Sequence, residues 1–349
     1  MKRIVFVVVR RFLCQAGLSI VGLLLATQAM ATQAGWRQIN VPGSTPDAAP
    51  ILVAMYYPTE APARAIAMGP FVVRIAIQAP PDPKFKGLIV LSHGTGGSEL
   101  GHSSLAESLA QHGYLVAALR HPGDNWQDRT LLRKGAARYF TERPQNVSRV
   151  IDVLLQDSAW SDRIARDGQG PRIGAVGHSA GGYTVLALAG GQADLSRLAT
   201  HCADHRADDP IFCSMGRSGQ PGPEAAPPTS PIPSLVDARV RAVVALAPVG
   251  AVFSAPSLAQ VRIPVAIYEA QQDRFLVSRF HAEWIARNLS GAVLHRIPNA
   301  WHFAFMDTPN TPIPSEDGDI GANPPGFDRQ ALLDRLKREL PIFFDTAFR

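Results

Sequence analysis

The sequence is most informative at residues 172–182, which read RIGAVGHSAGG. The apolar start is typical of a buried strand and residues 180–189 are typical of a helix, so Ser179 stands where a strand turns directly into a helix. The backbone at such a turn is strained, and Gly177 and Gly181 remove side chains that would collide across it. A lone Gly-x-Ser-x-Gly arises by chance in roughly one chain of this size in ten. The strand-to-helix setting nevertheless favours a nucleophilic serine over the alternative, a serine that only caps the helix.

Apolar, β-branched runs recur on both sides of this segment and alternate with helix-like stretches. They predict strands at Ile51–Tyr57, Phe71–Ile77, Leu88–Leu91, Leu115–Leu119, Arg172–Val176, Val240–Ala247, Ile263–Glu269 and Val293–Ile297. Helices are predicted near Ser103–His112, Asn146–Leu155, Ala180–Ala189, Ser278–Asn288 and Arg329–Leu340. This alternation is typical of right-handed βαβ units, so we expect an α/β domain with a mostly parallel sheet flanked by helices. The two earliest strands alternate in polarity, which indicates an antiparallel edge.

Two stretches rich in proline and glycine, Gly216–Ser234 and Thr308–Gly326, are predicted to be surface loops. The first completes an insertion from about Gly190 to Asp237 between the helix after Ser179 and the next strand. Insertions of this length are commonly lids, binding loops or surface additions. We therefore keep two interpretations open, a lid over the site and a plain surface feature.

A serine hydroxyl needs a base to take its proton and a carboxylate to orient that base. Where the nucleophile occupies a strand-to-helix turn, the acid and then the histidine follow it in the chain. Residues 238–268 contain no Asp or Glu, so the acid must come later. Asp273 lies just past a predicted strand and is the best candidate. Glu269 is the alternative but ends the strand itself, and Glu283 falls inside a predicted helix.

Three histidines follow Asp273 in the chain. His281 maps to a helix and His295 to a strand, whereas His302 maps to the loop after the last strand, where the base is expected. Trp301 and Phe303 flank His302, so a histidine packed in an aromatic cluster is the alternative. We predict that His302 is the base.

The reaction also needs donors for the oxygen that becomes negative in a tetrahedral intermediate. The backbone N–H of Ala180 should supply one and that of Thr95, in the loop His93–Gly97, the other. A phosphate-binding loop is the alternative for this segment, but no Lys-Ser or Lys-Thr pair follows it. The segment His121–Asp124 is interpreted as a turn, although it could line the pocket.

The chain begins with a basic stretch, an apolar run from Ala16 to Ala26 and the small-x-small sequence Ala29-Met30-Ala31. This pattern predicts a signal peptide over residues 1–31, a domain over 32–349, and a periplasmic or secreted location. Arg10-Arg11 leaves the Sec and twin-arginine routes open. Without four leader cations the formal charge falls from +5 to +1, 30 basic against 29 acidic residues. We therefore expect no nucleic-acid partner and no membrane span after the leader is removed.

Cys202 and Cys213 are the two cysteines outside the leader. In an oxidising compartment they are expected to form a disulfide that closes a short loop within the insertion. A catalytic or metal-binding pair is the alternative, but neither the spacing nor the neighbouring histidines fit well.

Four parts of the sequence together resemble a known group of enzymes. They are residues 91–97 (LSHGTGG), Gly177–Gly182, Asp273 and residues 299–303 (NAWHF). They are similar to serine-nucleophile α/β-hydrolases of the dienelactone hydrolase-like superfamily, close to platelet-activating factor acetylhydrolases and bacterial polyester hydrolases. The resemblance implies hydrolysis of small-molecule carboxylic esters, with short acyl groups, without cofactor or metal. A Ser stands where dienelactone hydrolases use a Cys. The alternatives are a prolyl-oligopeptidase-type serine peptidase and an inactive binding protein with the same fold.

Overall fold

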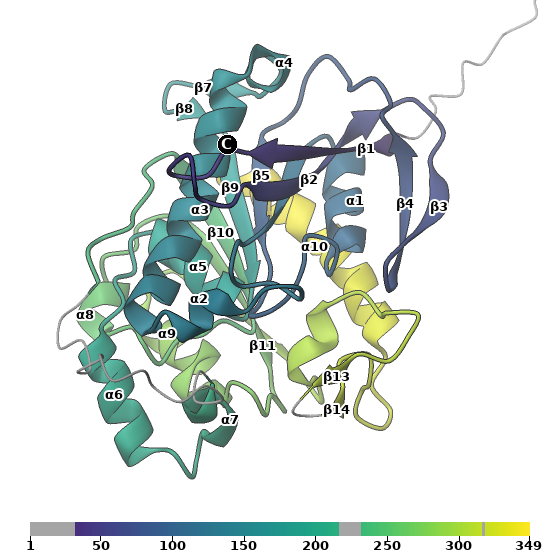
Figure 1. The fold of residues 1–349 in the computed structure, drawn as a ribbon. Coiled ribbons are helices and arrows are strands. Elements are labelled where there is room, and N and C mark those ends of the chain that lie inside the picture. The colour runs from purple at the N-terminus through teal and green to yellow at the C-terminus, as the bar shows by residue number, and fades with distance from the viewer. Residues whose placement is uncertain (1–31, 216–231, 316–317) are drawn as a thin grey trace, which may run out of the picture. The chain divides into compact units, whose positions relative to one another are not determined.

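The central feature of the computed structural model is a twisted sheet of ten strands, and Figure 1 shows helices packed on both sides of it. The structure describes residues 32–215, 232–315 and 318–349. All of them fall in the unit Ala31–Arg349. The predicted leader and most of the proline-rich stretch Gly216–Ser234 lie outside the described residues.

The strands are β1 Gln33–Val41, β2 Ile51–Thr59, β3 Arg64–Met68, β4 Phe71–Ile77, β5 Leu88–Ser92, β6 Leu115–Arg120, β9 Ile173–His178, β10 Val240–Leu246, β11 Val265–Ala270 and β12 Val293–Ile297. Their order across the sheet is β12-β11-β10-β9-β5-β6-β2-β1-β4-β3. Neighbours from β12 to β6 run parallel, whereas β2 pairs antiparallel with β6 and with β1. The predicted parallel sheet with an antiparallel edge is therefore confirmed.

The longer helices are α1 Ser103–Gln111, α3 Ala136–Gln156, α5 Ala180–Leu188, α6 Leu195–Asp204, α9 Ala282–Asn288 and α10 Arg329–Ala347. Shorter elements are α2 Thr130–Arg133, α4 Ser158–Ser161, α7 Pro210–Ser214, α8 Ala255–Leu258, η1 Ser278–Phe280 and η2 His302–Phe305. Two small hairpins join β7 Arg166–Asp167 to β8 Gly170–Pro171 and β13 Pro314–Ser315 to β14 Gly318–Asp319.

The central strands of the sheet are buried on both faces, which explains why β5 is apolar without interruption. Leu88 and Val90 belong to a cluster with α3, α5 and α9, whereas Ile89 and Leu91 belong to a second cluster with α1 and α10. A strand buried on both faces favours a continuous apolar run, because its alternate side chains point to opposite helical layers. The core therefore lies on both sides of these central strands.

Two helices are longer than predicted, and each contains a proline next to the predicted limit. The prediction began the α3 helix at Asn146, just past Pro144, and ended the α10 helix at Leu340, just before Pro341. Both helices continue through their prolines, which are buried. Packing against the sheet outweighs the lost hydrogen bond that normally ends a helix at proline.

Candidate active site

The sheet brings the candidate residues to one edge. In a doubly wound sheet the ligand site lies at the carboxyl ends of the strands, where neighbouring connections leave on opposite faces. The last paired residues of β5 and β9 are Ser92 and Gly177, so the loop His93–Gly97 and the turn containing Ser179 begin side by side. The strands β10, β11 and β12 continue in parallel beside β9 and direct the later loops to the same edge.

Ser179 occupies the sharp turn between β9 and α5. Its backbone has φ 57° and ψ −117°, a strained conformation for a residue with a side chain. A Cβ placed on Gly177 would lie 2.0 Å from the carbonyl oxygen of Gly181, and one on Gly181 would lie 1.9 Å from that of Ser92. Only glycine fits at either position, which is the requirement that the motif predicted.

Asp273 and His302 are joined directly. Asp273 follows β11, and its Oδ2 lies 2.6 Å from Nδ1 of His302. The other carboxylate oxygen accepts the backbone N–H groups of Phe275 and Leu276, each at 2.8 Å. The carboxylate is therefore fixed by its own turn, and it favours the tautomer in which Nδ1 of His302 carries the proton. That tautomer leaves Nε2 free to accept a proton.

His302 is also packed among aromatic rings, as the alternative interpretation expected. The Phe275 ring stacks on its imidazole with 5.1 Å between centroids. Nε2 of His178 lies 3.0 Å from the main-chain oxygen of His302 and, as a donor, ties this loop to the residue before Ser179. Burial is the main cause that holds the pKa of His178 well below its ordinary value, and the nearby His302 lowers it further. Within the described residues Ser179 Oγ makes no hydrogen bond, so its contact with His302 belongs to the proposal below.

The rejected candidates lie elsewhere. Glu269 pairs with Arg296 at 3.3 Å, and Glu283 reaches the same guanidinium at 3.9 Å. His281 is bound to Asp209, and His295 stacks on the Tyr268 ring at 4.4 Å. Within the described residues neither glutamate forms a hydrogen bond with His302, whereas Asp273 does.

The two predicted oxyanion donors flank the serine. Ala180 is the first residue of α5, and the Cβ position of Gly94, next to Thr95, lies 3.0 Å from Cβ of Ser179. Within the described part of the chain, neither the N–H of Ala180 nor that of Thr95 donates a hydrogen bond. Two unpaired backbone donors beside a serine provide the arrangement that stabilises a developing negative oxygen.

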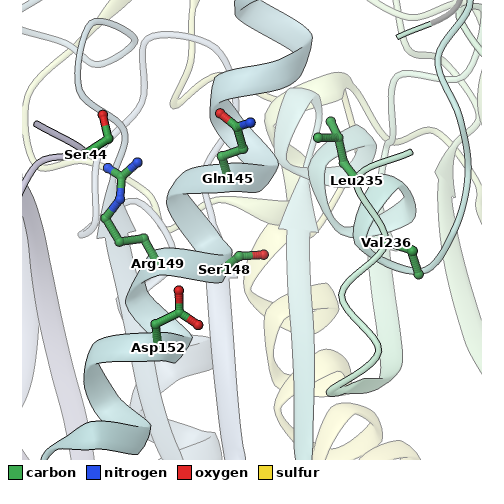
Figure 2. A pocket seen from close by; sticks show the side chains of 7 residues that line it. All are labelled: Ser44, Gln145, Ser148, Arg149, Asp152, Leu235 and Val236. Carbon is green, nitrogen blue, oxygen red and sulfur yellow. The ribbon is translucent and has the colours of Figure 1, made fainter. Parts of the chain in front are cut away.

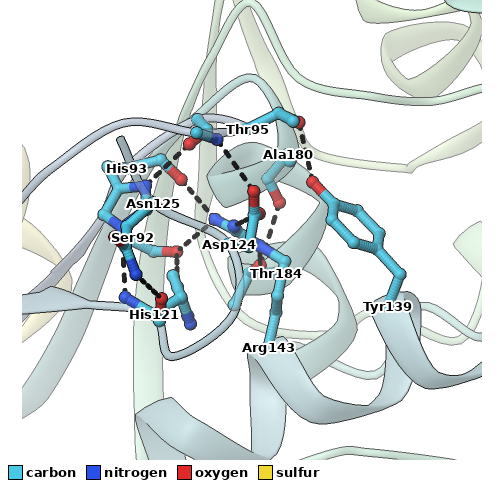
Figure 3. Close-up of polar contacts among 12 residues, drawn as sticks. Ser92, His93, Thr95, His121, Asp124, Asn125, Tyr139, Arg143, Ala180 and Thr184 are labelled. Atoms are coloured by element: carbon cyan, nitrogen blue, oxygen red, sulfur yellow. Dashed lines mark hydrogen bonds and ion pairs between the residues drawn. The ribbon is translucent and has the colours of Figure 1, made fainter. Parts of the chain in front are cut away.

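Sequence reasoning missed a buried polar network behind the Thr95 loop, drawn in Figure 3. Asp124, interpreted as part of a turn, forms an ion pair with Arg143 in which neither side chain is exposed. Tyr139 OH lies 2.7 Å from Oγ1 of Thr95. Asp124 and Arg143 stand among other polar residues, in HPGDNWQD and FTERPQN, so no sequence signal marked them as a buried pair.

One cluster has the residue types of a metal site: His201, Asp209 and His281. Both imidazole Nε2 atoms lie within 2.9 Å of Oδ2 of Asp209, and Nδ1 of His281 accepts the N–H of Gly250. Nε2 of His281 therefore carries a proton, which a metal ligand nitrogen cannot. Burial alone would raise the pKa of Asp209, but hydrogen bonds from both imidazoles lower it to about 2. The cluster is better described as a hydrogen-bonded clamp between the insertion and the segment after Asp273.

The predicted disulfide between Cys202 and Cys213 is confirmed. It joins α6 to α7 in the insertion, and these helices carry His201 and Asp209 of the clamp. The described part of the insertion thus packs beside the segment that follows Asp273.

The pocket in Figure 2, of about 460 Å³, lies away from these residues. It is formed by Arg149 and Asp152 of α3 together with Ser44 and Leu235. None of the candidate catalytic side chains lines it, so it is not the site described here. Among the described residues, no helix combines the length and the apolar character needed to cross a membrane.

Comparison with known proteins gives the class of fold. Residues 72–137, a minority of the chain, match the family described as platelet-activating factor acetylhydrolase, isoform II. No curated protein sequence matches the chain. A ferulic acid esterase from Streptomyces cinnamoneus is 19% identical, with a TM-score of 0.57 over 92% of this chain and 91% of its own.

Two further solved structures have a similar fold. A dienelactone hydrolase from Anabaena variabilis is 14% identical, with a TM-score of 0.50 over 90% of this chain and 98% of its own. An acylaminoacyl peptidase from Pyrococcus horikoshii is 11% identical, with a TM-score of 0.51 over 90% of this chain but 41% of its own. The chain has the α/β-hydrolase fold, which the dienelactone hydrolase shares. The predicted resemblance to platelet-activating factor acetylhydrolases is confirmed over residues 72–137.

Proposed function

We propose that this protein hydrolyses carboxylic esters through an acyl-enzyme, with Ser179 as nucleophile, His302 as base and Asp273 as the group that orients the base. The observation that carries the proposal is the 2.6 Å hydrogen bond between Asp273 and His302, at the same sheet edge as the strained turn of Ser179. A serine, a base and an acid at one edge form the arrangement of serine hydrolases on this fold.

The chemistry follows from these positions. Ser179 Oγ attacks the ester carbonyl while Nε2 of His302 takes its proton, and Asp273 stabilises the resulting imidazolium. The N–H groups of Thr95 and Ala180 bind the oxygen that becomes negative. Collapse of this intermediate breaks the bond to the alcohol, which leaves with the proton from His302. Water then repeats the sequence and releases the acid.

The substrate is proposed to carry a short acyl group. This follows from the resemblance to platelet-activating factor acetylhydrolases, whose family model matches residues 72–137, including the Thr95 loop. Every role in the reaction is taken by a side chain or backbone group of the chain, so the proposed steps require no cofactor or metal.

The test compares turnover of 4-nitrophenyl acetate, butyrate and octanoate by the wild type, by Ser179→Ala and by a control, Ser158→Ala, at an exposed serine. We expect the acetate and butyrate to be hydrolysed fastest, the control to match the wild type, and Ser179→Ala to retain no turnover above background. Equal turnover by wild type and Ser179→Ala would contradict the proposal.

Amide substrates separate the proposal from its alternatives. A prolyl-oligopeptidase-type peptidase would cleave peptide 4-nitroanilides with a kcat/KM comparable to that for esters, and we expect the esters to be preferred. An inactive binding protein would not react with a fluorophosphonate, whereas we expect the probe to label Ser179, as peptide mass analysis would show.

We also propose that the protein is exported to the periplasm or secreted. The leader pattern of residues 1–31 and the Cys202–Cys213 disulfide support this, because disulfides persist in oxidising compartments. Fractionation of bacteria producing the full chain, with N-terminal sequencing of the product, tests it. A cytoplasmic protein that retains Met1 would refute it.

A further inference from the structure

Arg143 and Asp124 are charged side chains in a place where charges are costly. Both are fully buried, and they form an ion pair with each other. Removing two charges from water is unfavourable unless further hydrogen bonds satisfy both of them. The remaining contacts of this pair therefore indicate what it holds in place.

One set of contacts reaches the loop that carries Thr95. Oδ1 of Asp124 accepts the N–H of Gly96 at 2.8 Å, and the guanidinium of Arg143 donates to the main-chain oxygen of His93. The same guanidinium lies 3.3 Å from Oγ of Ser92. The pair thus forms hydrogen bonds with the backbone on both sides of Thr95 (Figure 3).

The peptide between Gly94 and Thr95 is fixed by the same loop. The Gly94 oxygen accepts the N–H of Gly97 at 3.0 Å, and Nδ1 of His93 lies 2.6 Å from it. The C=O and N–H of a trans peptide point in opposite directions, so these bonds also set the direction of the Thr95 N–H. A shift of His93 or Gly96 would rotate this donor.

The second set of contacts reaches the turn of the serine. Nε of Arg143 donates to Oγ1 of Thr184 at 3.2 Å, and the Thr184 hydroxyl donates to the carbonyl of Ala180 at 2.9 Å. One guanidinium is therefore connected to the loop of one oxyanion donor and to the residue that supplies the other.

We propose that the Arg143–Asp124 pair is a positioning pair that fixes the two oxyanion donors, Thr95 and Ala180, relative to each other. This inference rests on the proposed ester hydrolysis. The surrounding histidines do not share the charge: burial, followed by Arg143, lowers the pKa of His93 to about 4 and that of His121 well below its ordinary value. Neutralising Asp124 therefore leaves the buried Arg143 without its partner.

The test uses Asp124→Asn, which keeps an acceptor for Gly96 but removes the charge. Its matched control is Asp237→Asn, in a buried aspartate that pairs with Arg239 at 2.7 Å just before β10, away from the serine edge. With 4-nitrophenyl acetate we expect kcat of Asp124→Asn to fall about 10- to 100-fold, because misplacing a reacting group or donor costs about this much. We expect KM to stay within about twofold, since ground-state binding does not depend on the oxyanion donors.

A transition-state analogue separates positioning from folding. An alkyl trifluoromethyl ketone adds to Ser179 and places a negative oxygen at the donors, so its inhibition constant should rise in proportion to the loss in kcat/KM. All rates are divided by the fraction of enzyme that a fluorophosphonate labels. Thr184→Val, which nearly preserves the side-chain shape, breaks the link to Ala180 and should lower kcat several-fold even if Asp124→Asn does not fold.

The outcomes separate the two proposals. An unchanged kcat in Asp124→Asn, or in Thr184→Val if Asp124→Asn does not fold, overturns the inference and leaves ester hydrolysis standing. A loss of rate explained by the labelled fraction, or shared equally by Asp237→Asn, makes the pair merely structural and also overturns it. A wild type that hydrolyses no ester overturns both.

Discussion

Replacing Asp273 by Asn should reverse the hydrogen bond that orients His302. One oxygen of Asp273 accepts two backbone N–H groups, from Phe275 and Leu276, and only an oxygen can remain there. The amide nitrogen of Asn must then face Nδ1 of His302, where it donates instead of accepting. His302 is forced to carry its proton on Nε2, so it can no longer take the proton of Ser179.

The size of the effect follows from this reversal. A wrong tautomer lowers kcat by about 10⁴-fold in a serine triad, which corresponds to about 5 kcal/mol in activation free energy. The fold should change little, because the turn after Asp273 keeps both of its hydrogen bonds. The measurements are kcat for 4-nitrophenyl acetate and the melting temperature of each variant.

The control is Glu269→Gln, at the alternative acid, which pairs with Arg296 and does not contact His302. It should keep kcat within a few-fold of the wild type. If Asp273→Asn keeps more than a tenth of the wild-type kcat, or if Glu269→Gln loses as much, then Asp273 is not the residue that orients the base.

Three further predictions concern stability. A Cβ on Gly181 would lie 1.9 Å from a main-chain oxygen of β5. Gly181→Ala should therefore lower the free energy of unfolding in urea by about 3 kcal/mol. Gly168→Ala, where a Cβ would meet nothing within 4 Å, should lower it little, and equal losses in the two variants would contradict this prediction. Burial raises the pKa of Glu107 to about 7 from 4.5, so the folded state binds this proton more tightly than the unfolded state. The free energy of unfolding should therefore fall as the pH rises from about 4.5 to 7. Glu107→Gln should remove that fall, and an unchanged dependence of the free energy on pH in this variant would refute the prediction. Replacing Cys202 and Cys213 by Ser should cost about 2–3 kcal/mol, and dithiothreitol should destabilise the wild type but not this variant.

The sequence predicted the candidate triad residues because they depend on local order along the chain. A parallel strand delivers its next loop to the carboxyl edge, so strand assignments alone place Ser179, Asp273 and His302 at one edge. The acid-free stretch before Glu269 then left few choices. Each of these residues could be predicted because its position relative to the end of a strand determines its place at the sheet edge.

The sheet edge was less predictable. β1 mixes polar and apolar residues and β3 is only five residues long. β1 is a strand because it pairs along its whole length with β2, a partner that a single-sequence pattern does not reveal. The same limit applies to the extended helices α3 and α10, where burial of Pro144 and Pro341 against the core overrides the local preference.

The oxyanion donors show most clearly what the sequence could not predict. This also concerns the alternative that the protein is an inactive binding protein with the same fold. Glycine spacing predicts that the Thr95 loop lies beside Ser179, but the direction of its N–H depends on Arg143 and Asp124, which become neighbours only through folding. A chain could keep Ser179, Asp273 and His302 and still align these donors poorly. Motif matching therefore does not distinguish an active hydrolase from a binding protein on this fold, whereas retention of the buried pair is a second criterion that the kinetics of Asp124→Asn can test.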